Sequence, residues 1–87
     1  MTYEYVPQGV CSRLIRLTIE EGRIVQVQFA GGCHGNLQGI SALVAGEPVD
    51  EVIAKLEGIR CGGKSTSCPH QLTLALRAAR AEAQSDL

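Results

Sequence analysis

Apolar and polar residues alternate in the first third of the chain. Every second residue from Ile15 to Ile19 is apolar, and the same holds from Val25 to Phe29. A period of two is that of a strand that buries one face. Because Glu21-Gly22 favours a tight turn between them, the two strands are predicted to pair as an antiparallel hairpin. Tyr3 and Tyr5 predict a third strand at an edge of the sheet.

The apolar spacing changes to that of helices after the Gly31-Gly32 pair. Asn36 can cap a first helix, which ends near Gly46. A second helix carries Pro48 in its first turn, where proline is tolerated, and stops at Gly58. The apolar residues that share a face are Leu37, Ile40 and Val44 in the first helix and Val49, Val52, Ile53 and Leu56 in the second.

A third helix is predicted to begin at Pro69, after a glycine-rich loop. Because the strands come first and the helices follow, the sequence predicts one α+β domain over residues 1–87. It consists of a small two- or three-stranded antiparallel sheet with three helices packed on one face. The apolar stripe of the third helix is Leu72, Ala75, Leu76, Ala79 and Ala83.

Composition makes a further source of stability plausible. A chain of 87 residues buries only about 60 to 65% of the surface that its unfolded form exposes. The only aromatic residues are Tyr3, Tyr5 and Phe29, so the core must come from smaller aliphatic side chains. Short domains of this kind commonly add a disulfide or a metal site.

Charge and targeting signals limit the expected class of partner and the expected cellular compartment. The net charge is -1 and the charges of both signs are interspersed, so no nucleic-acid partner is expected. The segment Met1 to Tyr5 lacks the pattern of a secretory signal, and no stretch could span a membrane. We therefore expect a cytoplasmic protein, in which cysteines stay reduced.

All four cysteines fall at the boundaries of predicted elements, whereas a core thiol would lie on an apolar stripe. Cys33 and Cys68 also precede helices, and a helix N-terminus favours the metal-binding thiolate. The sequence therefore predicts that the four side chains converge on one metal site. A closed set of four thiolates suits structural Zn²⁺, and an iron-sulfur cluster could use the same set. The predicted ligands are Cys11, Cys33, Cys61 and Cys68.

Three segments carry a resemblance to a known family: FAGGCHGNLQGIS at residues 29–41, IRCGGK at 59–64 and TSCP at 66–69. They closely resemble the TSCPD domain family, and the resemblance spans nearly the whole chain. That family includes stand-alone short proteins and a C-terminal module of adenosylcobalamin-dependent ribonucleotide reductases. The resemblance implies that the four cysteines bind zinc and that a ribonucleotide reductase or another protein is a partner. His70 stands where the name motif has aspartate.

The predicted order of elements is also similar to that of NifU/IscU-type iron-sulfur scaffolds. Arg13 stands where the scaffold has an aspartate, Ser67 stands where some members have histidine, and Cys61 has no counterpart. A labile cluster suits an open ligand set, so a fourth thiolate favours permanent holding of a metal. The resemblance therefore implies the scaffold's topology rather than its function. The residues that fall on the scaffold's cluster ligands are Cys11, Cys33 and Cys68.

Two further signals are weaker. Residues 58–65 satisfy the G-x-x-x-x-G-K-[ST] pattern of phosphate-binding loops, but a predicted helix precedes them where such a loop follows a strand. Lys64 is therefore interpreted as a solvated loop charge. His34 and His70 each neighbour a cysteine and could replace one thiolate as ligand, although a polar role at a helix start is the simpler interpretation.

The leading hypothesis is a non-catalytic metal-binding domain, accessory to ribonucleotide reduction and deoxynucleotide synthesis. No reductase active site is identifiable, so ribonucleoside-diphosphate reductase activity would rest on kinship alone. Two alternatives stay open: an iron-sulfur cluster scaffold or carrier, and a dithiol redox shuttle that uses Cys61 and Cys68. The oligomeric state is left open by the sequence.

Overall fold

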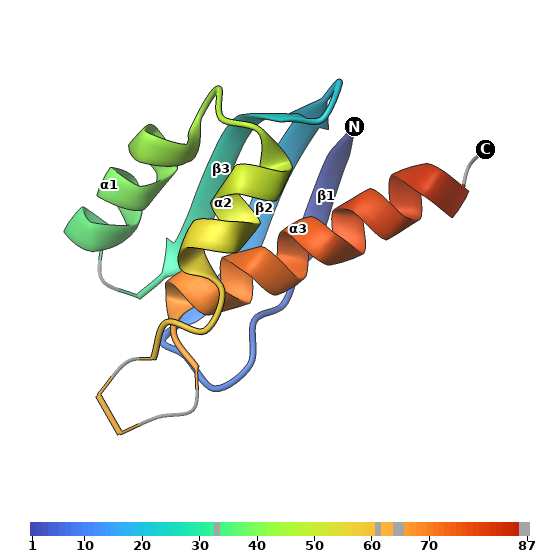
Figure 1. The fold of residues 1–87 in the computed structure, drawn as a ribbon. Coiled ribbons are helices and arrows are strands. Elements are labelled where there is room, and N and C mark those ends of the chain that lie inside the picture. The colour runs from blue at the N-terminus through green and yellow to red at the C-terminus, as the bar shows by residue number, and fades with distance from the viewer. Residues whose placement is uncertain (33, 61, 64–65, 86–87) are drawn as a thin grey trace.

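The chain folds into a three-stranded sheet followed by three helices (Figure 1). The computed structural model describes residues 1–32, 34–60, 62–63 and 66–85. The strands are antiparallel in the order β1-β2-β3, so the predicted α+β class is confirmed and β1 lies at an edge as expected. The elements are β1 (Thr2–Tyr5), β2 (Ser12–Glu20), β3 (Arg23–Gly31), α1 (His34–Val44), α2 (Val49–Leu56) and α3 (Cys68–Ser85).

The predicted hairpin turns at Glu21 and Gly22, whose φ angles are 53° and 77°. Two central residues with positive φ match the right-handed twist of a hairpin. Glycine adopts this conformation without strain, which explains why a glycine occupies position 22. The sequence thus placed the turn correctly.

A bulge near this turn changes which residues of β3 face the core. The register shifts between Thr18 and Ile19, so that Ile24 pairs with Ile19 and Val25 is the extra residue. Ile24 is fully buried, whereas Val25 is 53% exposed. The prediction that Val25 shares the buried face with Val27 is therefore wrong, because one extra residue reverses the alternation.

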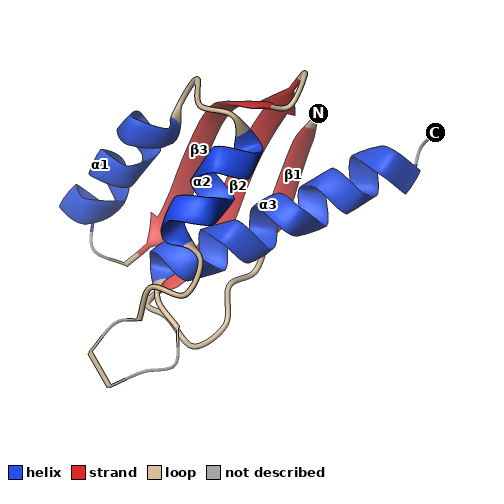
Figure 2. Cartoon of the chain, in the orientation of Figure 1, coloured by secondary structure: helices blue, strands red, loops and turns tan. Residues whose placement is uncertain are grey.

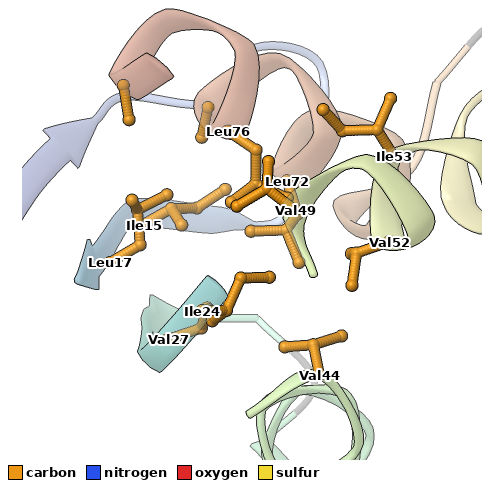
Figure 3. Close-up of a cluster of buried hydrophobic side chains, with 12 residues drawn as sticks. Ile15, Leu17, Ile24, Val27, Val44, Val49, Val52, Ile53, Leu72 and Leu76 are labelled. Atoms are coloured by element: carbon orange, nitrogen blue, oxygen red, sulfur yellow. The ribbon is translucent and has the colours of Figure 1, made fainter. Parts of the chain in front are cut away.

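Helices α2 and α3 lie across one face of the sheet, and α1 lies alongside β3 (Figures 1 and 2). Apolar side chains from both layers meet there and form one cluster (Figure 3). Burying each of its larger aliphatic side chains stabilises the fold by about 1.5 to 3 kcal/mol. The core residues are Ile15, Leu17, Ile24, Val27, Val44, Val49, Val52, Ile53, Leu72, Ala75, Leu76 and Ala79.

The helices end near the predicted glycines, but their starts differ from the prediction by one to three residues. Gly46 and Gly58 follow α1 and α2 with φ of 85° and 86°, which is the usual backbone at a helix C-terminus. Helix α1 begins at His34, so Asn36 lies inside the helix and the prediction that it caps the helix is wrong. Pro48 precedes α2 as an extended N-cap residue rather than lying in its first turn.

Among the described residues, no helix is both long enough and apolar enough to cross a membrane. Helix α3, with 18 residues, reaches the length needed but carries several charged side chains. The stripe predicted for α3 is buried from Leu72 to Ala79, and the polar residues Gln71 and Thr73 are buried with it. The side chain of Ala83 lies outside the described residues.

Candidate metal site

The start of α3 is held by Ser67, which is 4% exposed. Its hydroxyl Oγ accepts a hydrogen bond from the His70 backbone N–H at 3.2 Å and donates one to the Ile59 carbonyl at 2.6 Å. The first bond is that of an N-cap residue, and the second ties the chain after α2 to α3. Cys68 is therefore the first residue of the helix and Pro69 is the second. The helix begins one residue before the predicted start at Pro69.

The sulfur of Cys68 lies against the start of β2. The distance from Cys68 Sγ to Ser12 Oγ is 3.3 Å, within the range of a hydrogen bond to sulfur. Ser12 is 3% exposed and directly follows Cys11 in the chain, while Cys68 is half-buried and Cys11 is exposed. The Cys68 sulfur therefore lies beside the residue that follows Cys11, although the two cysteines are far apart in sequence.

The end of β3 approaches Cys11 closely. A Cβ atom added to Gly32 would lie 3.2 Å from Cys11 Sγ and 2.9 Å from Leu37 Cδ1. Gly32 also has a φ of 82°, a conformation that other residues rarely adopt. Only glycine fits at this position, which immediately precedes Cys33.

Gln71 joins the segment before Cys11 to α3. Its side-chain Oε1 accepts from the Gln8 backbone N–H and its Nε2 donates to Thr66 Oγ1, both at 3.0 Å. Gln71 is 4% exposed, and the sequence reasoning missed it. The sequence did contain a signal for its burial. Gln71 lies one helical turn before Ala75 and so on the same side of the helix as the apolar stripe.

His70 has a structural contact that bears on its predicted role. Its Nδ1 accepts a hydrogen bond from the Gly58 backbone N–H at 2.9 Å, which ties the end of α2 to the first turn of α3. Only Nε2 is then left for a metal. This contact favours the polar helix-start interpretation of His70, and the side chain of His34 lies outside the described residues.

Of the four predicted cysteine ligands, the structure describes the surroundings of two. It brings Cys11 and Cys68 to the same end of the sheet, around Ser12. Cys33 and Cys61 lie outside the described residues, so their convergence stays a prediction. Among the residues that are described, no group of three or more His, Cys, Asp or Glu side chains is placed to hold a metal ion.

The context of the phosphate-loop pattern is that of a helix-to-helix connection. Residues 58–65 follow α2 rather than a strand, and α3 begins only at Cys68. A phosphate-binding loop instead follows a strand and opens directly into a helix. The predicted helix before this segment is therefore confirmed, while Lys64 itself lies outside the described residues.

The fold is a small α+β domain in which Cys11 and Cys68 lie near the same end of the sheet. A family model described as the TSCPD domain matches residues 1–80. The chain belongs to the TSCPD domain family, as its motifs predicted. No curated protein and no solved structure matches the chain, so the similarity to NifU/IscU-type scaffolds stays a prediction.

Proposed function

We propose that this TSCPD domain is a non-catalytic metal-binding domain in which four thiolates hold one zinc ion. The observation that supports the proposal is that Cys68 Sγ lies 3.3 Å from the hydroxyl of Ser12, the residue that directly follows Cys11. Gly32 lies against the Cys11 sulfur. The next residue in the chain is the third cysteine, Cys33. The proposed ligands are Cys11, Cys33, Cys61 and Cys68.

The chemistry of the described residues fits such a site. Cys68 is the first residue of α3, and its sulfur lies against the start of β2. The Ser12 hydroxyl can donate to Cys68 Sγ, and such supporting contacts orient metal ligands and hold their charge. A bound zinc ion would cross-link the start of β2 to α3 and so stabilise the fold.

The biological role that we propose is accessory rather than catalytic. Kinship with the C-terminal module of adenosylcobalamin-dependent ribonucleotide reductases makes such a reductase the first partner to test. The domain would then act in the cytoplasm, in deoxynucleotide synthesis. Zinc in a closed set of thiolates has no open position for a substrate, which is why a structural role is proposed.

Metal analysis of protein purified without added metal tests this function. We expect about one zinc per chain and a loss of at least about tenfold in zinc affinity in each Cys→Ser variant. Ala81→Ser is the matched control, because Ala81 is an exposed residue of α3. It should keep full zinc content.

Other outcomes would contradict the zinc proposal. Visible charge-transfer colour after anaerobic reconstitution with iron and sulfide would instead favour the iron-sulfur alternative. Reversible disulfide formation by Cys61 and Cys68 in metal-free protein would favour the dithiol shuttle. Protein that neither contains nor takes up metal would exclude both the zinc and the cluster sites.

A further inference from the structure

The outer edge of β3 is largely without backbone partners. Near the hairpin, the Ile24 N–H donates to the Glu47 carbonyl at 2.9 Å and the Ile24 carbonyl accepts from the Gly46 N–H at 2.6 Å. From Val25 to Gly31, the described part of the chain supplies no further backbone bond on this side. An edge strand of this kind presents a row of donors and acceptors to another extended chain.

A groove of about 700 Å³ runs beside this edge. Its lining includes six consecutive residues, 27–32. Successive side chains of a strand point to opposite faces, so a groove lined by consecutive residues follows the edge of the sheet rather than one face. Helix α1, which lies alongside β3 (Figure 1), forms the opposite wall with Leu37, Gln38 and Ser41.

We propose that this groove binds an extended segment of a partner protein, which adds to β3 as a fourth strand. A row of unpaired backbone groups is complementary to an extended chain and not to a helix, whose backbone groups are already paired. If a second copy paired its own β3 with this edge, its α1 would come up against the α1 that forms the wall of the groove. The groove between β3 and α1 therefore suits a single strand.

The two sides of the groove specify the side chains of that segment. Val27 and Phe29 lie on the core face of the sheet, and Leu37 lines the groove on the helix side. Arg16 and Gln28 line the groove on the open face of the sheet. Because side chains of neighbouring strands lie side by side on one face, the partner segment should alternate apolar and polar residues.

Charge favours acidic residues at the polar positions. Arg13 Nε would lie 3.1 Å from a Cβ added to Gly31, so this guanidinium lies beside the end of the groove. Arg13 is exposed, and within the described residues it has no acidic partner. An acidic side chain of the bound segment would supply that partner.

Titration of the isotope-labelled full chain with a synthetic peptide of alternating valine and glutamate tests the proposal. We expect saturable shifts of the amide signals from Val25 to Gly31, with a Kd below about 1 mM. Methylation of alternate peptide nitrogens removes the donors of one peptide edge and should weaken binding at least about tenfold. A peptide of valine and lysine should bind more weakly than the glutamate peptide.

Matched variants separate the groove from other surfaces. Ser41→Trp places a bulky side chain in the groove and should weaken peptide binding at least about tenfold. Ala42→Trp, at the next and exposed position of α1, should leave binding unchanged. Arg13→Glu should reverse the preference, so that the lysine peptide binds better than the glutamate peptide.

Several outcomes would overturn the proposal. They are the absence of saturable binding at peptide concentrations up to about 10 mM, amide shifts confined to residues outside β3 and α1, and equal binding by Ser41→Trp. Self-association that uses the β3 edge and that the peptide does not displace would show that a second copy is the occupant. None of these results depends on whether the cysteines hold zinc.

Discussion

Gly32 is the residue at which the geometry of the candidate site is most tightly constrained. Its positive φ and the approach of Cys11 Sγ and Leu37 Cδ1 leave no room for a side chain. The need for glycine at a strand-to-helix junction could be predicted from the sequence. The identity of the neighbours could not, because Cys11 precedes the adjacent strand β2 and is far away in the chain.

Replacing Gly32 with alanine should destabilise the fold by about 1 to 3 kcal/mol, since it combines a strained backbone with a steric clash. Urea denaturation monitored by circular dichroism measures the free energy of unfolding. Gly35→Ala is the control, because a Cβ on this helical glycine meets nothing within 4 Å. It should be neutral or stabilise by up to about 1 kcal/mol, and equal effects of the two substitutions would refute the argument.

At the scale of elements, the start of α3 shows how local and distant contacts combine. Ser67 caps the helix through the His70 N–H and also donates to Ile59. The sequence predicts that Pro69 opens the helix. In the structure Cys68 opens it and Ser67 is the cap. The bond to Ile59 depends on how α2 packs against α3, which periodicity does not reveal.

Ser67→Ala should lower the free energy of unfolding by about 1 to 2 kcal/mol, because it removes the cap and leaves the Ile59 carbonyl without its donor. Thermal and urea unfolding would measure the change. Ser67→Thr keeps the hydroxyl and should recover most of the stability. A loss as large in the threonine variant as in the alanine variant would show that the hydroxyl is not responsible.

At the scale of the whole molecule, one apolar cluster joins the sheet to the helices. Leu72 of α3 is fully buried in it, together with Ile15 of β2 and Ile53 of α2 (Figure 3). Because five separately predicted elements contribute to this cluster, its loss affects the entire domain. The burial of these residues follows from stripes that were readable in the sequence.

Leu72→Ala should reduce the free energy of unfolding by about 2 to 5 kcal/mol, as expected for a cavity in a packed core. Leu43→Ala is the matched control, since Leu43 is 79% exposed and its truncation should change stability by less than about 0.5 kcal/mol. Chemical denaturation of both variants would provide the comparison. Similar losses for the two leucines would contradict the assignment of the core.

The sequence by itself determined the type and order of the elements, with two or three strands in the sheet, because a period of two or of about 3.6 residues is a local property of the chain. It also identified the turn at Gly22 and the apolar stripe of α3. Tertiary structure alone decided that Val25 faces outward, that Gln71 links two segments and that Cys68 lies against Ser12. Each of these depends on a bulge or on packing between residues far apart in the chain, which no short-range pattern encodes.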